Sequence, residues 1–136
     1  MSVACLRFPV IRPALIVVAC SLLGAQALGQ AAAQDAACEN ARSTAVMREC
    51  EIGRLKRAEA AMNAAYRSLS AKLDPRGQAK LRAAQQSWLQ FRAAEADYQA
   101  DSARDGTLAP LIAASVQADL TESRRKALQE AAREIK

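Results

Sequence analysis

The residue types that could carry out chemistry are few in this chain of 136 residues, and their placement argues against catalysis. Histidine is absent, no serine stands in a nucleophile-elbow context, and no glycine-rich phosphate loop occurs. Carboxylate pairs occur at Glu49 and Glu51 and at Asp97 and Asp101, but they fall on polar faces with basic neighbours. We therefore expect no catalytic residue, no cofactor and no metal, and a protein that is not an enzyme.

The four cysteines divide into two groups. Cys5 and Cys20 lie in an N-terminal leader, which leaves Cys38 and Cys50 alone in the rest of the chain. In an oxidising compartment an isolated pair of this kind predicts one disulfide, which would attach the N-terminal segment to the first long helix. A metal or redox pair is the weaker alternative, because the chain has neither a histidine nor a Cys-x-x-Cys motif.

Two arginines, Arg92 and Arg124, are candidates for a polar site. Arg92 lies four residues after Trp88 and three before Glu95, a spacing that lets it stack on the indole and pair with the carboxylate. Arg124 is expected to join this network or to pair with an acid of the first helix, such as Glu59. The favoured role is a polar network that fixes the register of the helices, and a site for an anionic ligand is the alternative.

The stretch that positions these residues runs from Lys80 to Tyr98. Its apolar residues recur at steps of three, four and seven, which predicts one face of an amphipathic helix. These residues are Leu81, Ala84, Trp88, Phe91 and Tyr98. Aromatic side chains bury the largest areas, so the structural core is predicted to gather the four aromatic residues outside the leader. They are Tyr66, Trp88, Phe91 and Tyr98.

A first long helix is predicted from Ser43 or Thr44, either of which can cap it, to about Leu73. An apolar row recurs every seven residues along it, which predicts lengthwise packing against another helix. The row consists of Leu55, Met62 and Leu69. Asp74 and Pro75 then supply a cap and a first helical residue, so this helix and the Trp88 helix are expected to form a tight antiparallel hairpin.

The C-terminal part is predicted to form two shorter helices after a loop at Asp105-Gly106-Thr107. Pro110 suits the first turn of one helix, and Asp119 or Thr121 would cap the other. No stretch of the mature chain alternates apolar and polar residues as a half-buried strand would. The predicted fold class is therefore all-α, a small helical bundle built on a long antiparallel helix hairpin plus two shorter C-terminal helices.

Residues 1–30 have the features of a signal peptide. Two arginines precede an apolar run that is shorter than the roughly 20 residues of a membrane span, and small residues follow. Cleavage after residues 25–27 is favoured, and a lipoprotein box ending at Cys20 is the alternative. We expect an exported protein, periplasmic or lipid-anchored, in which residues 31–136 form one domain without a membrane span.

The charge balance excludes one class of partner. Without the two arginines of the leader, the 19 Lys and Arg become 17 against 14 acids, with the signs interspersed. Such a weakly basic surface is not that of a nucleic-acid-binding protein, so we expect protein partners. The oligomeric state is left open.

The order of several spaced residues resembles the LprI-type family of lysozyme inhibitors, small exported helical proteins of bacteria. The resemblance covers roughly residues 38–128, nearly the whole mature chain. The residues that carry it include Cys38, Thr44, Met47, Cys50, Gln85, Trp88, Phe91, Arg92, Thr121, Arg124 and Leu128. It implies inhibition of lysozyme by protein contact, with Gln85, Arg92, Thr121 and Arg124 as polar motif residues.

The resemblance also implies two further cysteines, at positions where this chain has Ala96 and Val116. Both replacements are apolar, as the replacement of a disulfide by ordinary packing requires. We therefore expect Ala96 and Val116 to face each other across a helix interface.

The candidate partner contacts are Asp101 and Asp105, in the loop of residues 101–107. Host lysozymes are strongly cationic, so an acidic surface would speed association, whereas this mature chain is slightly basic. Either the acids are gathered on one face or lysozyme is not the target. The alternative function is an envelope structural or adaptor module that binds another envelope protein or self-associates through its helix hairpin.

Overall fold

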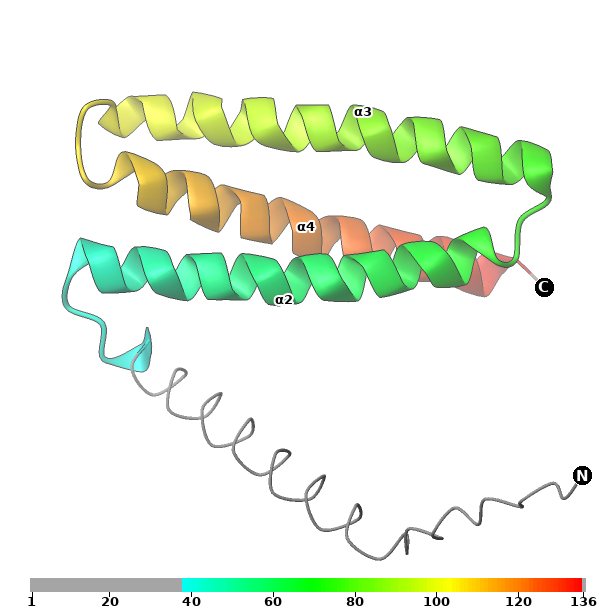
Figure 1. Ribbon diagram of the computed structural model, residues 1–136, viewed down its shortest axis with the longest axis horizontal. Coiled ribbons are helices and arrows are strands. Elements are labelled where there is room, and N and C mark those ends of the chain that lie inside the picture. The colour runs from blue at the N-terminus through cyan, green and yellow to red at the C-terminus, as the bar shows by residue number, and fades with distance from the viewer. Residues whose placement is uncertain (1–37, 136) are drawn as a thin grey trace, which may run out of the picture. The chain divides into compact units, whose positions relative to one another are not determined.

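The computed structural model describes residues 38–135, which form three long helices and one short 3-10 turn (Figure 1). The elements are α2 (Thr44–Ser70), α3 (Pro75–Ala100), η2 (Asp101–Ala103) and α4 (Ala109–Glu134). No strand occurs among the described residues, and the predicted all-α class is confirmed. The predicted leader of residues 1–30, with Cys20, lies outside the described part of the chain.

The start of α2 is defined by a cap and a disulfide. The Ser43 hydroxyl accepts a hydrogen bond from the Val46 amide at 3.3 Å, so Ser43 is the capping residue. The predicted disulfide joins Cys38 to Cys50, with their Cα atoms 5.7 Å apart. Because Cys50 lies inside α2, this bond ties the preceding segment to the helix.

The junction between α2 and α3 follows the predicted chemistry. The Asp74 carboxylate accepts a hydrogen bond from the Gly77 amide at 2.7 Å, and Pro75 occupies the first turn of α3. The two helices run antiparallel on either side of this junction, although α2 ends at Ser70 rather than near Leu73 (Figure 1).

A single helix, α4, replaces the two shorter C-terminal helices that we predicted from the sequence. Asp119 and Thr121, the expected caps of a second helix, lie inside α4. The Asp119 carboxylate accepts a hydrogen bond from Arg54 of α2 at 2.7 Å, and the Thr121 hydroxyl donates to the Gln117 carbonyl at 2.6 Å. Asp119 is held by another helix, and the Thr121 hydroxyl bonds a carbonyl one turn earlier in α4, so neither side chain caps a new helix start and the helix continues through them.

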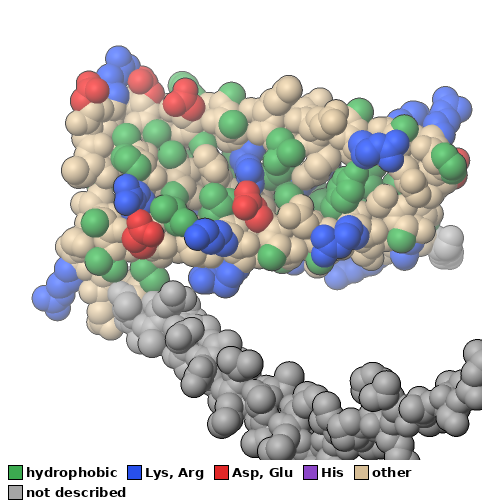
Figure 2. Space-filling view, in the orientation of Figure 1, with side chains coloured by type: hydrophobic (Ala, Val, Ile, Leu, Met, Phe, Trp, Pro, Cys, Tyr) green, Lys and Arg blue, Asp and Glu red, His purple; other side chains and the backbone are tan. Residues whose placement is uncertain are grey.

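The closest helix pair is α2 with α4, rather than α2 with α3. Short alanine side chains are buried on both members of the pair, among them Ala58, Ala65, Ala114 and Ala118, and they allow the two backbones to approach. The Cα atoms of α2 and α3 approach each other at few points, so the antiparallel hairpin is not the tight one that we predicted, and Figure 2 shows hydrophobic side chains in the space between these helices. The lengthwise packing predicted for α2 is therefore directed at α4.

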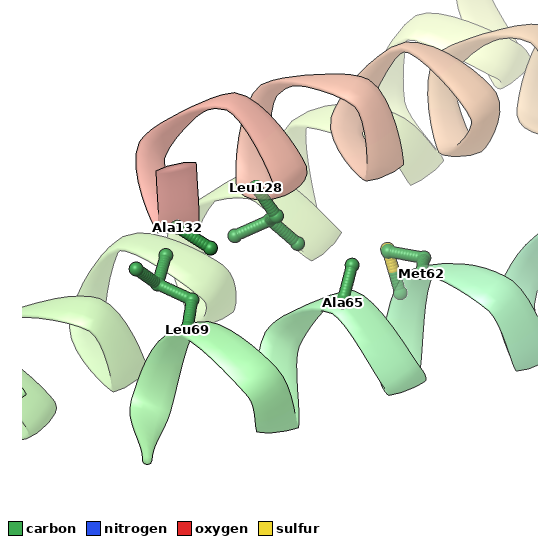
Figure 3. Packing of buried hydrophobic residues seen from close by; sticks show 5 residues of the cluster. All are labelled: Met62, Ala65, Leu69, Leu128 and Ala132. Carbon is green, nitrogen blue, oxygen red and sulfur yellow. The ribbon is translucent and has the colours of Figure 1, made fainter. Parts of the chain in front are cut away.

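The hydrophobic core lies between α2 and α4. Its buried members are Met62, Ala65, Leu69, Leu128 and Ala132. Figure 3 shows Leu128 pointing from α4 toward the three core residues of α2. Trp88 and Tyr66 are half-buried and pack against this cluster.

Two of the four aromatic residues predicted for the core lie on the surface. Phe91 is 52% exposed and Tyr98 is 75% exposed. The inward face of α3 follows another row, at steps of three and four, which is Leu81, Gln85, Trp88, Arg92 and Ala96. Because this row contains a glutamine and an arginine, its apolar pattern is incomplete in the sequence. Phe91 precedes Arg92 by one residue and is therefore rotated about 100° away from the core.

Candidate functional site

The polar residues of the family motif converge on Trp88 of α3. The guanidinium carbon of Arg92 lies 5.3 Å from the centroid of the indole ring, and that of Arg124 lies 5.9 Å from it. Both distances are within the range of cation–π attraction. The indole is therefore in contact with one arginine of its own helix and one of α4.

Arg92 links all three helices. Its guanidinium donates a hydrogen bond to the Glu59 carboxylate of α2 at 2.9 Å and another to the Thr121 hydroxyl of α4 at 2.9 Å. The Arg92 side chain is 14% exposed and Thr121 is completely buried. The predicted stacking on the indole is present, but the predicted pairing with Glu95 is not, because Glu95 accepts from Gln99 instead.

Gln85 and Arg124 extend this network toward α4. The Arg124 Nε donates to the Gln85 Oε1 at 3.1 Å, and the Gln85 Nε2 lies 3.5 Å from the Met62 sulfur in the core. Arg92 and Arg124 thus contact the indole, and Thr121 and Gln85 are bonded to these arginines. We refer to these four residues with Trp88 and Glu59 as the Trp88 network. Among residues 38–135, no buried side-chain nitrogen or oxygen lacks a hydrogen-bond partner.

Replacement of Arg92 with methionine tests whether this network fixes the helices. The variant leaves Thr121 and Glu59 without their charged donor, and we expect a loss of about 2 kcal/mol in the free energy of unfolding, less than for a fully buried pair because Glu59 is partly solvated. The measurement is urea denaturation. The control is Arg82→Met, because Arg82 is an exposed arginine of α3 that lies outside the inward-facing row. An equal loss in both variants would show that the network adds nothing.

A second polar cluster, which sequence analysis missed, joins α2 to α4 around Arg54. Its guanidinium donates to Glu51 at 2.9 Å, to Asp119 at 2.7 Å and to the Ser115 carbonyl at 3.3 Å. Burial acts to lower the pKa of Arg54, but the hydrogen bonds to Asp119 and Glu51 outweigh it, so this pKa is raised. Ser115 and Asp119 lie 61 and 65 residues after Arg54 in the chain, so no local sequence pattern predicts that they bind it.

Asp101 and Asp105 lie in the turn between α3 and α4, apart from the Trp88 network. Both are exposed, and Asp101 forms an ion pair with Arg104. Asp105 has a φ of 64°, in the left-handed region that aspartate and asparagine tolerate better than most residues. We call residues 101–108 the acidic turn.

Charge is segregated along α3 and the acidic turn. Residues 93–108 contain four acids and one base, whereas residues 67–82 contain five bases and one acid. Figure 2 shows acidic side chains gathered over the end of α3 and basic side chains over its start. The acids are Glu95, Asp97, Asp101 and Asp105. The protein therefore has a small positive net charge overall but an acidic region at the end of α3 and in the acidic turn.

Ala96 and Val116 occupy the interface between α3 and α4. Ala96 is 1% exposed and Val116 is half-buried. The hydrogen bond between Arg92 and Thr121 fixes the antiparallel register, and Ala96 lies four residues after Arg92 while Val116 lies five before Thr121. The two residues are therefore at the same level of the interface, and a direct contact between them stays a prediction.

Residues 38–135 lack both a membrane-spanning helix and a cluster of metal-ligand side chains. No helix in this part of the chain combines the length and apolar character needed to cross a membrane. No group of three or more His, Cys, Asp and Glu side chains is arranged there to hold a metal ion.

Comparison with known protein families agrees with the resemblance noted in the sequence. A family model described as Lysozyme inhibitor LprI matches residues 35–128. The matched range spans the positions of the disulfide, the Trp88 network and the acidic turn. Searches of curated proteins and of solved structures found no significant match. Because the family model covers more than half of the chain, the protein belongs to the LprI family of lysozyme inhibitors.

Proposed function

We propose that this protein is an exported, non-enzymatic inhibitor of lysozyme that acts by protein contact. The observation that carries the proposal is the family match over residues 35–128. Export is supported by the leader-like residues 1–30 and by the disulfide between Cys38 and Cys50, a bond that persists in oxidising compartments. The periplasm is the favoured location, and a lipid anchor at Cys20 is the alternative.

The acidic turn is the proposed contact surface. Asp101 and Asp105 are exposed there, and Leu108, which is 51% exposed, supplies an apolar side chain beside them. Interfaces combine a desolvated apolar centre with a polar rim, and complementary charge chiefly raises the rate of association. An acidic end on a weakly basic protein therefore suits a cationic enzyme, which the net charge alone does not indicate.

The first test is inhibition of an animal-type and a bacterial-type lysozyme by the oxidised protein, added in excess at low and at physiological salt. We expect dose-dependent inhibition that weakens as salt rises, because exposed charges are screened. Absence of inhibition for both enzymes at both salts would exclude the proposal. The envelope adaptor described above would then be the leading function.

Neutralising the acidic turn with Asp101→Asn and Asp105→Asn together should slow association with a cationic lysozyme about tenfold at low salt and much less at high salt. Asparagine is chosen because it also tolerates the positive φ of residue 105. The measurement is the association rate by surface plasmon resonance.

The control for this prediction is the pair Glu130→Gln and Glu134→Gln near the C-terminal end of α4. Both positions are exposed, and Glu130 is ion-paired with Arg133 three residues on, as Asp101 is with Arg104. The two double variants therefore remove the same charge from similar surroundings. Equal rates for both would place the contact elsewhere on the protein.

A further inference from the structure

α3 and its C-cap residue Asp101 carry a continuous stripe of exposed residues along one surface. The stripe follows alternating steps of four and three residues, the spacing of a two-helix seam. It consists of Lys80, Ala84, Ser87, Phe91, Ala94, Tyr98 and Asp101, all of them exposed. Its two aromatic side chains, 52% and 75% exposed, form the main apolar area that α2 and α4 leave uncovered on α3.

This stripe is complementary to itself when a second α3 runs antiparallel to the first. Phe91 lies at its middle and would meet the Phe91 of the other copy. In that register Ala84 lies opposite Tyr98, and Ser87 lies opposite Ala94. A small residue therefore faces each tyrosine, and the two helices can approach closely without a clash.

The charges at the two ends of the stripe also favour the antiparallel orientation. At the two ends of the stripe, Lys80 of one copy lies opposite Asp101 of the other. The start of α3 is basic and its end is acidic, so an antiparallel pair brings opposite charges together and a parallel pair brings like charges together. The present ion pair of Asp101 with Arg104 is exposed, with side chains 56% and 72% accessible, and such a pair is weak enough to be exchanged.

We propose that two copies of this chain associate through residues 80–101, along α3 and its C-cap Asp101, antiparallel and with a twofold axis at Phe91. Such an isologous contact closes at two copies and does not propagate. At 1.5 Å per residue the stripe is roughly 30 Å long, and each buried aromatic side chain covers on the order of 150–250 Å². This contact is small among specific interfaces, so the dimer is expected to dissociate on dilution.

Sedimentation velocity on the oxidised protein, expressed from the full chain, tests this proposal from about 1 µM to about 500 µM. We expect a shift from monomer to dimer mass with rising concentration. Phe91→Asp should leave a monomer throughout, because it places two carboxylates at the twofold axis. Leu89→Asp, at an α3 position that is 41% exposed but outside the stripe, should retain the dimer.

Exchange of charge makes the test specific for orientation. Lys80→Glu and Asp101→Lys should each weaken the dimer at least about tenfold, because each places like charges opposite one another. The double variant should recover most of the lost affinity. Circular dichroism checks that each variant is folded, which is expected since all four substituted positions are exposed.

Three outcomes would overturn the proposal: a monomer at every concentration, a dimer that survives Phe91→Asp, or a double variant no better than the single ones. The measurement contains no lysozyme, so its failure leaves the proposed inhibition untouched, and the reverse also holds.

Discussion

Replacement of Leu128 with alanine is expected to lower the free energy of unfolding by about 3 kcal/mol. Leu128 is 2% exposed and points from α4 into the core residues of α2 (Figure 3). The substitution removes buried carbon atoms and leaves a cavity that only a movement of whole helices could close. The cost therefore combines the lost burial of the side chain with the lost contacts around the cavity.

The loss is measured by urea denaturation and should lower the melting temperature by roughly 15 °C in a domain of this size. Leu89→Ala is the matched control, since Leu89 is 41% exposed on α3 and should lose less than about 1 kcal/mol. Similar losses for the two variants would contradict the packing of α4 on α2 described above.

Removal of the disulfide by Cys38→Ser and Cys50→Ser together is expected to lower the free energy of unfolding by about 3 kcal/mol. The two cysteines are 12 residues apart, and opening a loop of this length frees the unfolded chain to adopt many more conformations. The helical content should change little, because the core cluster and the Trp88 network lie outside the loop.

Urea denaturation of the oxidised protein, the reduced protein and the double serine variant provides the measurement. The reduced protein and the serine variant should agree, which separates loss of the bond from effects of the serine side chains. A change below about 1 kcal/mol would mean that the segment from residue 38 to the start of α2 is not held in the native state.

Helix starts and the disulfide are predictable from the sequence because their causes are local or leave no choice. Ser43 needs only an amide three residues on, and Asp74 followed by Pro75 suits the start of a helix. The cysteine pair has no competitor outside the predicted leader. The motif residues around Trp88 are likewise visible in the sequence, through the resemblance to the family.

The continuity of α4 is not predictable in this way. Asp119 and Thr121 are good capping residues by type, and their local spacing favours a new helix start. Their hydrogen bonds to Arg54 and Gln117 remove that option. One of these partners lies on another helix, so its effect appears only when the chain is folded.

Which side of α3 points toward the core is the second feature that only the tertiary structure decided. By hydrophobicity alone Phe91 and Tyr98 belong in the core, and Gln85 and Arg92 belong on the surface. The structure reverses this, because the partners of Arg92, Glu59 of α2 and Thr121 of α4, lie on the inner side.

The sequence by itself determined the all-α class, a first helix that starts at Ser43 or Thr44, the cap at Asp74, and the disulfide. The tertiary structure decided that α2 pairs with α4, that α4 is continuous, and that two aromatic residues face solvent. The physical reason is the sequence distance between interacting residues. A cap or a disulfide pair is set by the residue types in one segment. The facing of an amphipathic helix depends on hydrogen-bond partners that other helices bring within reach.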